Sequence, residues 1–199
     1  AQLAIVVAAL GGTAFDGFSR TRFWSEIIFG RGKWELTLFN TIGLIWIVAV
    51  VGVAYHLAGK LGSRTTGDSR FSERFGVSLV PILFGYDLAH YFSLLLLEGQ
   101  AFKVLISDPF GKGWNIFGTA NWVVSSSHLT NYESAVLIWY MQTSGIVLVH
   151  IGAVIVYHLL QLHAAASWNK TLLGQVPATV LMIGYTVFGL WLLSTPVVS

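Results

Sequence analysis

The sequence predicts an all-α fold, a polytopic integral membrane bundle of about four full transmembrane helices preceded by a partial N-terminal helix. Apolar residues make up 55% of the 199 residues, only 10% are charged, and the mean hydropathy is +0.70. Such values exceed what a soluble core of this size needs. Eight Trp, seven Tyr and thirteen Phe supply rings of the kind that settle at the membrane–water interface, which predicts aromatic interfacial segments.

The N-terminal region predicts the partial helix followed by one of these interfacial segments. The first apolar run, Ala1–Leu10, is too short to cross the hydrocarbon core, which takes about 20 residues. Gly11–Glu35 mixes aromatic and basic side chains, as segments that lie on a membrane surface do. Asp16 precedes a glycine there and predicts an Asx-type turn at a helix end, with a catalytic carboxylate as the alternative.

Charged residues bound four runs that approach or exceed spanning length, because a helix satisfies its own backbone in lipid and a loop does not. The runs are Leu36–Ala58, Phe75–Leu97, Tyr132–Leu162 and Leu173–Val197. Gly145 and Gly152 in the third run suit close contact with a neighbouring helix. The long, aromatic connection Glu98–Asn131 is interpreted as re-entrant or functional.

Nothing in the sequence indicates a second domain, so residues 1–199 are expected to form a single transmembrane domain, the C-terminal part of a longer protein. The cell membrane is the expected location and the lipid bilayer the first partner. Other membrane subunits or an N-terminal half are the further partners that we expect.

Composition excludes several classes of function. The chain has no Cys, which excludes disulfides, thiolate catalysis, iron–sulfur clusters and zinc sites that use sulfur. The net charge is only +2 and no basic run could follow a phosphate backbone, so nucleic acid is not an expected partner. No nucleophile elbow, phosphate loop, dinucleotide fingerprint or zinc-protease motif is present.

Ionisable side chains inside the spanning runs are candidate functional residues, because each costs about 2.5–3.5 kcal/mol to insert. Asp87 and His90 are three residues apart on one helical face, where they could ligate one ion, share one proton or form a structural polar bridge. His150 and His158 lie about 12 Å apart along an ideal helix, too far to share an ion. His56 lies at a depth similar to that of His150, which allows an interhelical pair, whereas His158 suits an interfacial anchor.

Longer motifs carry a family resemblance. They are Leu79-Val80-Pro81 through Ala89-His90-Tyr91, Ser107-Asp108-Pro109-Phe110-Gly111, Gly113-Trp114-Asn115-Ile116-Phe117-Gly118-Thr119-Ala120, and Leu172-Leu173-Gly174-Gln175-Val176-Pro177. In these motifs the chain is similar to a family of multi-pass actinobacterial membrane proteins. Some members carry the name fenitrothion hydrolase, after a membrane-bound enzyme that degrades organophosphates. Members are longer, with further helices upstream, and this chain resembles their C-terminal half.

The resemblance implies functional roles for the positions that match the family's pattern, which are Asp16, His90, Glu98, Asp108, His150 and His158. Asp87 and His163 do not match it. The resemblance therefore favours His90 with His150, joined by a carboxylate from another helix or loop. We take Asp16 and Asp108 as candidate catalytic carboxylates, and His90, His150, His158 and Asp87 as candidate metal ligands.

Four functions remain open at this point. The first is a metal-dependent hydrolase of a lipophilic ester, in which zinc or a similar ion activates water. The second is a transporter or proton-relay component. The third is a haem-binding redox subunit, which the thirteen-residue spacing of His150 and His163 suggests, although no other helix repeats that spacing. The fourth is a structural subunit that packs against other membrane proteins.

Overall fold

The structure, a computed structural model, describes residues 2–162 and 168–194. These residues form α-helices and no β-strand, which confirms the predicted all-α fold. The helices are α1 (Gln2–Ser19), α2 (Arg22–Ile28), α3 (Lys33–Thr66), α4 (Phe71–His90), α5 (Phe92–Ser107), α6 (Ser127–Thr130), α7 (Tyr132–Leu162) and α8 (Trp168–Ser194). Among them, α3, α7 and α8 are long and apolar enough to cross a membrane, and α4 with α5 makes a fourth span if the bent pair counts as one.

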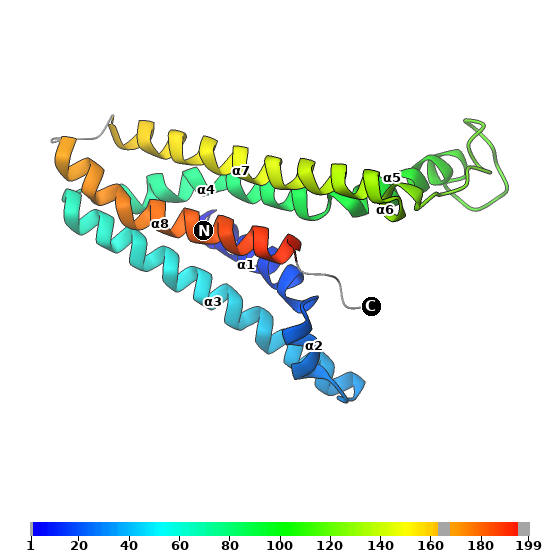
Figure 1. Cartoon of the computed structure of the whole chain (residues 1–199), viewed down its shortest axis with the longest axis horizontal. Helices are drawn as coiled ribbons and strands as arrows, with labels where there is room; N and C mark the ends of the chain where they lie inside the picture. The colour runs from blue at the N-terminus through cyan, green and yellow to red at the C-terminus, as the bar shows by residue number, and fades with distance from the viewer. Residues whose placement is uncertain (1, 163–167, 195–199) are drawn as a thin grey trace.

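The long helices lie side by side along the long axis of the molecule (Figure 1). α4 packs along α7, and α3 packs along both α1 and α8. α1, α4 and α8 run toward the end where α2 lies, whereas α3 and α7 run the opposite way. Large apolar side chains such as Ile45, Val53 and Leu148 are exposed on the outer faces, and a surface of this kind suits contact with a lipid bilayer.

The hydropathy pattern placed most of the helices correctly. The predicted run Tyr132–Leu162 coincides with α7, and Leu36–Ala58 lies within the longer α3. The last run, Leu173–Val197, follows α8 as far as Ser194, and its final three residues lie outside the described residues. α1 is apolar but shorter than the spanning helices, in agreement with the predicted partial helix.

The segment after α1 folds back against α3. Thr21 caps α2 by accepting a hydrogen bond from the backbone N–H of Trp24, and the Trp24 indole Nε1–H donates to Asn40 Oδ1 over 2.9 Å. The segment predicted to be interfacial, Gly11–Glu35, contains the second half of α1, the whole of α2 and the start of α3. The predicted turn at Asp16 was wrong, since this residue lies inside a continuous helix.

The run Phe75–Leu97 was predicted as one helix, and this was wrong. α4 ends at His90, α5 begins at Phe92, and their axes are bent by 64°. The backbone at Tyr91, with φ −91° and ψ 5°, takes the chain out of regular helical geometry. Neither Gly nor Pro lies at this bend, so the sequence carries no local signal for it.

Close contact between α4 and α7 depends on a glycine other than those predicted. A Cβ atom on Gly85 would lie 2.5 Å from the Val149 Cγ2 atom, so only glycine fits at this crossing. Gly145 and Gly152 have open space around their Cβ positions, and their predicted role in close packing was wrong. The crossing holds the end of α4, with Asp87 and His90, against the middle of the bundle.

Candidate functional site

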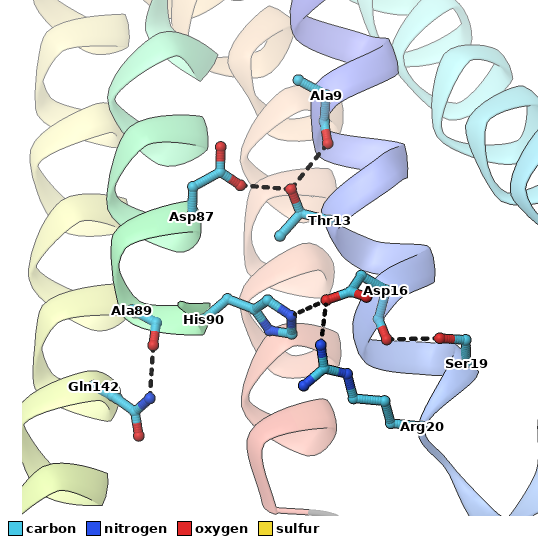
Figure 2. A network of polar contacts seen from close by, with 9 residues as sticks. All are labelled: Ala9, Thr13, Asp16, Ser19, Arg20, Asp87, Ala89, His90 and Gln142. Carbon is cyan, nitrogen blue, oxygen red and sulfur yellow. Dashed lines mark hydrogen bonds and ion pairs between the residues drawn. The ribbon is translucent and has the colours of Figure 1, made fainter. Parts of the chain in front are cut away.

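An aspartate and a histidine from two helices meet inside the bundle (Figure 2). His90, at the end of α4, places Nε2 at 2.7 Å from Oδ2 of Asp16 on α1. The His90 side chain is 9% exposed and that of Asp16 is 34% exposed. With Asp16 ionised, the imidazole N–H donates to the carboxylate in a short, charge-assisted hydrogen bond.

Arg20 connects this pair to the surface. Its guanidinium lies 3.0 Å from the same Asp16 oxygen, and its side chain is 52% exposed. The spacing of four residues brings the two side chains onto one face of α1 and its C-terminal end. Asp16 therefore lies between an exposed cation and a buried imidazole, at the boundary of the bundle.

A second polar contact joins the same helices one turn away. The Thr13 hydroxyl lies within hydrogen-bond distance of both the Asp87 carboxylate and the Ala9 carbonyl oxygen. Thr13 and Asp16 are three residues apart on α1, as Asp87 and His90 are on α4, and the two helices run in the same direction (Figure 2). The contacts Thr13–Asp87 and Asp16–His90 therefore form two parallel rungs between α1 and α4.

His150 lies deeper in the bundle, on α7. Its Nδ1–H donates to the Ile146 carbonyl oxygen over 2.7 Å, because a carbonyl oxygen accepts and does not donate. Its Nε2 is buried and has no hydrogen-bond partner among the described residues, and the same is true of the Tyr86 hydroxyl. The Tyr86 ring stacks on His90 with centroids 6.0 Å apart, and the Tyr185 ring contacts both Tyr86 and His150.

The buried face of α7 carries polar side chains along much of its length. Gln142, His150, Tyr157 and Gln161 are all buried on this helix. We call these four residues the polar stripe. It covers the 20 residues from 142 to 161, whose ends lie roughly 28 Å apart along the helix, close to the ~30 Å of a hydrocarbon core.

Both ends of the polar stripe meet other helices through polar contacts. Gln142 donates from Nε2 to the carbonyl oxygen of Ala89, the residue before His90, over 2.7 Å (Figure 2). At the opposite end, the Gln161 Oε1 atom accepts from Arg74 Nε on α4 over 3.3 Å, and Arg74 also pairs with Asp68. One end of the stripe thus lies beside the residue that precedes His90, and the other end lies beside the Arg74–Asp68 pair.

The remaining candidate residues lie apart from the Asp16–His90 pair. His158 Nδ1 contacts the Gln175 side chain on α8 at 2.9 Å. His56 is exposed on α3 whereas His150 is buried, so the predicted interhelical pair does not form. Glu98 is exposed on α5, and His163 lies outside the described residues.

Asp108 has a local structural role. Its two carboxylate oxygens accept hydrogen bonds from the backbone N–H groups of Lys112 and Gly113, each over 2.8 Å, and so close the turn after α5. The 16 residues of α5 separate it from His90 by roughly 24 Å. The two candidate catalytic carboxylates, Asp16 and Asp108, are therefore not brought together.

The candidate metal ligands do not assemble into one site in the part of the chain that the structure describes. No group of three or more His, Asp or Glu side chains there is placed to hold a metal ion. Asp87 pairs with Thr13, His90 pairs with Asp16, and His150 uses Nδ1 for a backbone carbonyl. These residues do not fit a zinc centre, and a metal-dependent hydrolase stays a prediction from the sequence.

Several residues of the site were not predicted from the sequence. Thr13, Arg20, Gln142 and Gln161 are polar but common in membrane helices, and hydropathy gives them little weight. One signal could have revealed the rungs, because Thr13 and Asp16 repeat the three-residue spacing of Asp87 and His90.

Comparisons of the chain with models of protein families, with curated proteins and with solved structures found no match.

Proposed function

We propose that the chain is a proton-relay component of a transport protein in the cell membrane, in contact with lipid and with other membrane subunits or an N-terminal part. The observation that carries the proposal is the polar stripe of α7. A buried face that served packing alone would be less costly with apolar side chains, because polar groups inside a bilayer cost free energy. Chains of groups that bind and release protons inside helical bundles are what proton pathways use.

The Asp16–His90 pair is the entry of this relay. Asp16 is partly exposed beside Arg20, so its carboxylate can exchange protons with water. His90 is buried behind it, and its imidazole can accept a proton on one nitrogen and release one from the other. The short contact between Asp16 and His90 lets the proton pass without crossing apolar space.

His150 and Tyr86 continue the relay into the bundle. Neutral His150 donates from Nδ1, which leaves Nε2 as the nitrogen that can accept a proton. The Tyr86 hydroxyl is a second buried group that can both donate and accept. At the other end of the stripe, Gln161 and the Arg74–Asp68 pair provide the exit.

Proton flux into liposomes tests the proposal. The full chain is reconstituted into liposomes that contain a pH-sensitive dye, and a potassium diffusion potential drives protons inward. We expect flux above that of empty liposomes, with a loss of most of it in His90→Gln and in His150→Leu. His56→Gln is the matched control, because His56 lies exposed on α3 and outside the relay. Circular dichroism and gel filtration establish that each variant is folded.

Two results would contradict the proposal. One is flux of the unchanged chain equal to that of empty liposomes. The other is a flux that His90→Gln and His150→Leu reduce no more than His56→Gln does, which would favour the structural-subunit hypothesis. Elemental analysis of the same preparations tests the sequence-based hydrolase hypothesis. About one equivalent of bound zinc that is lost in His90→Gln would favour a metal site over the relay.

A further inference from the structure

A large apolar cavity lies between α1, α3, α4 and α8, with Tyr185 in its wall. Its volume is about 550 Å³, within the range of cavities that bind small molecules. The walls include Ala14, Ile82 and Met182, which are almost completely buried. Among the residues that the structure describes, no charged side chain lines the cavity.

The chemistry of the lining selects a hydrocarbon ligand. Two tyrosines line the cavity, and both hydroxyls already bond to protein. Tyr185 donates to the Leu10 carbonyl oxygen over 2.8 Å, and Tyr55 donates to the Ser72 carbonyl oxygen. A polar ligand group would lose its bonds to water on entering and find few replacements, whereas an alkyl chain would lose none.

The cavity is continuous with the outer, lipid-facing surface. Trp46 and Val50 on α3 and Val180 on α8 line the cavity and are also strongly exposed. Both helices are long and apolar enough to span a membrane, so the acyl chains of the bilayer meet this opening. We propose that the cavity binds one acyl chain of a bilayer phospholipid, which enters sideways between α3 and α8.

This site is distinct from the proposed relay. None of the residues that form the two rungs lines the cavity, nor does any residue of the polar stripe. Tyr185 is the shared wall, because its ring borders the cavity and also contacts Tyr86 and His150. A test that leaves the relay residues unchanged therefore separates the two proposals.

Photocrosslinking in nanodiscs tests the proposal. The probe is phosphatidylcholine with a diazirine in one acyl chain, and adducts on the full chain are mapped to single residues by mass spectrometry. We expect adducts on the wall residues Ala14 and Met182 as well as on the lipid-facing residues Val53 and Leu148. Ordinary boundary lipid reaches only the second pair, because the first pair is buried.

Two variants close the cavity. Gly184→Leu places a side chain in the opening of the cavity, where a Cβ atom at Gly184 meets nothing within 4 Å. Ala54→Leu extends a wall side chain into the cavity volume. Both should abolish the adducts on Ala14 and Met182 and leave the lipid-facing adducts unchanged, which also reports correct insertion. Gly152→Leu is the matched control, because its Cβ position is equally open but lies on α7 outside the cavity.

The proposal fails if the unchanged chain carries adducts only on lipid-facing residues, which would mean that lipid stays at the boundary or that a protein segment fills the cavity. It also fails if the wall adducts persist in both Gly184→Leu and Ala54→Leu. Loss of the wall adducts in Gly152→Leu would show that they report a general change of packing.

Discussion

The contact between Asp16 and His90 can be weighed by a double-mutant cycle that uses Asp16→Asn, His90→Gln and the combined variant. A hydrogen bond to a charged group contributes about 1.5–3 kcal/mol when it is well shielded. The Asp16 side chain is 34% exposed and shares its oxygen with Arg20, so solvent screening reduces that value. Interhelical hydrogen bonds in membranes average about 0.6 kcal/mol and reach about 1.7 kcal/mol. We therefore expect a coupling free energy of about 1 kcal/mol.

Reversible unfolding in mixed detergent micelles measures this coupling from the four unfolding free energies. The control cycle removes Arg22 and Glu26, whose side chains are also in contact, over 3.0 Å, but are 85% and 65% exposed. That pair should couple by less than about 0.5 kcal/mol. A coupling for Asp16 and His90 no larger than that of the control pair would refute the interpretation of their contact as a shielded, specific bond.

Two further predictions concern packing and the loop after α5. Gly85→Ala should destabilise the bundle by about 1–3 kcal/mol in the same unfolding assay, because the new Cβ atom clashes with Val149. Adding Val149→Ala should restore part of the lost stability. An unfolding free energy that Gly85→Ala leaves unchanged would contradict the close crossing. Asp108→Ala should speed proteolysis within residues 108–126, because two backbone N–H groups lose their acceptor, with the helical content unchanged. Unaltered cleavage would show that Asp108 does not hold this turn.

The helices were largely predictable because the bilayer imposes length and apolarity on each span separately. Tyr132–Leu162 could be read from hydropathy alone, since its boundaries are set by charged or polar residues at its ends. The bend at Tyr91 could not be predicted, because no Gly or Pro marks it. The structure shows its place only through the backbone angles of Tyr91 and the separate axes of α4 and α5.

Several residues of the site could be predicted from the sequence, but the residues that they contact on other helices could not. The three-residue spacing correctly put Asp87 and His90 on one face of α4, and hydropathy correctly marked His150 as a residue inside a spanning helix. Their partners come from α1 and from the backbone of α7, because the rotation of one helix against another follows from packing contacts such as Gly85 against Val149. Periodicity gives the face of a helix but does not say which helix it meets.

The equal spacing of the two rungs specifies the position of α1 along α4. Sliding α1 by three residues, or about 4.5 Å, in its C-terminal direction would place Thr13 opposite His90, where a hydroxyl can still bond to an imidazole. Sliding it the same distance in the other direction would place Asp16 opposite Asp87, where two carboxylates would repel each other unless one bound a proton. The observed register is therefore the one in which both polar side chains of α4 face a polar partner on α1.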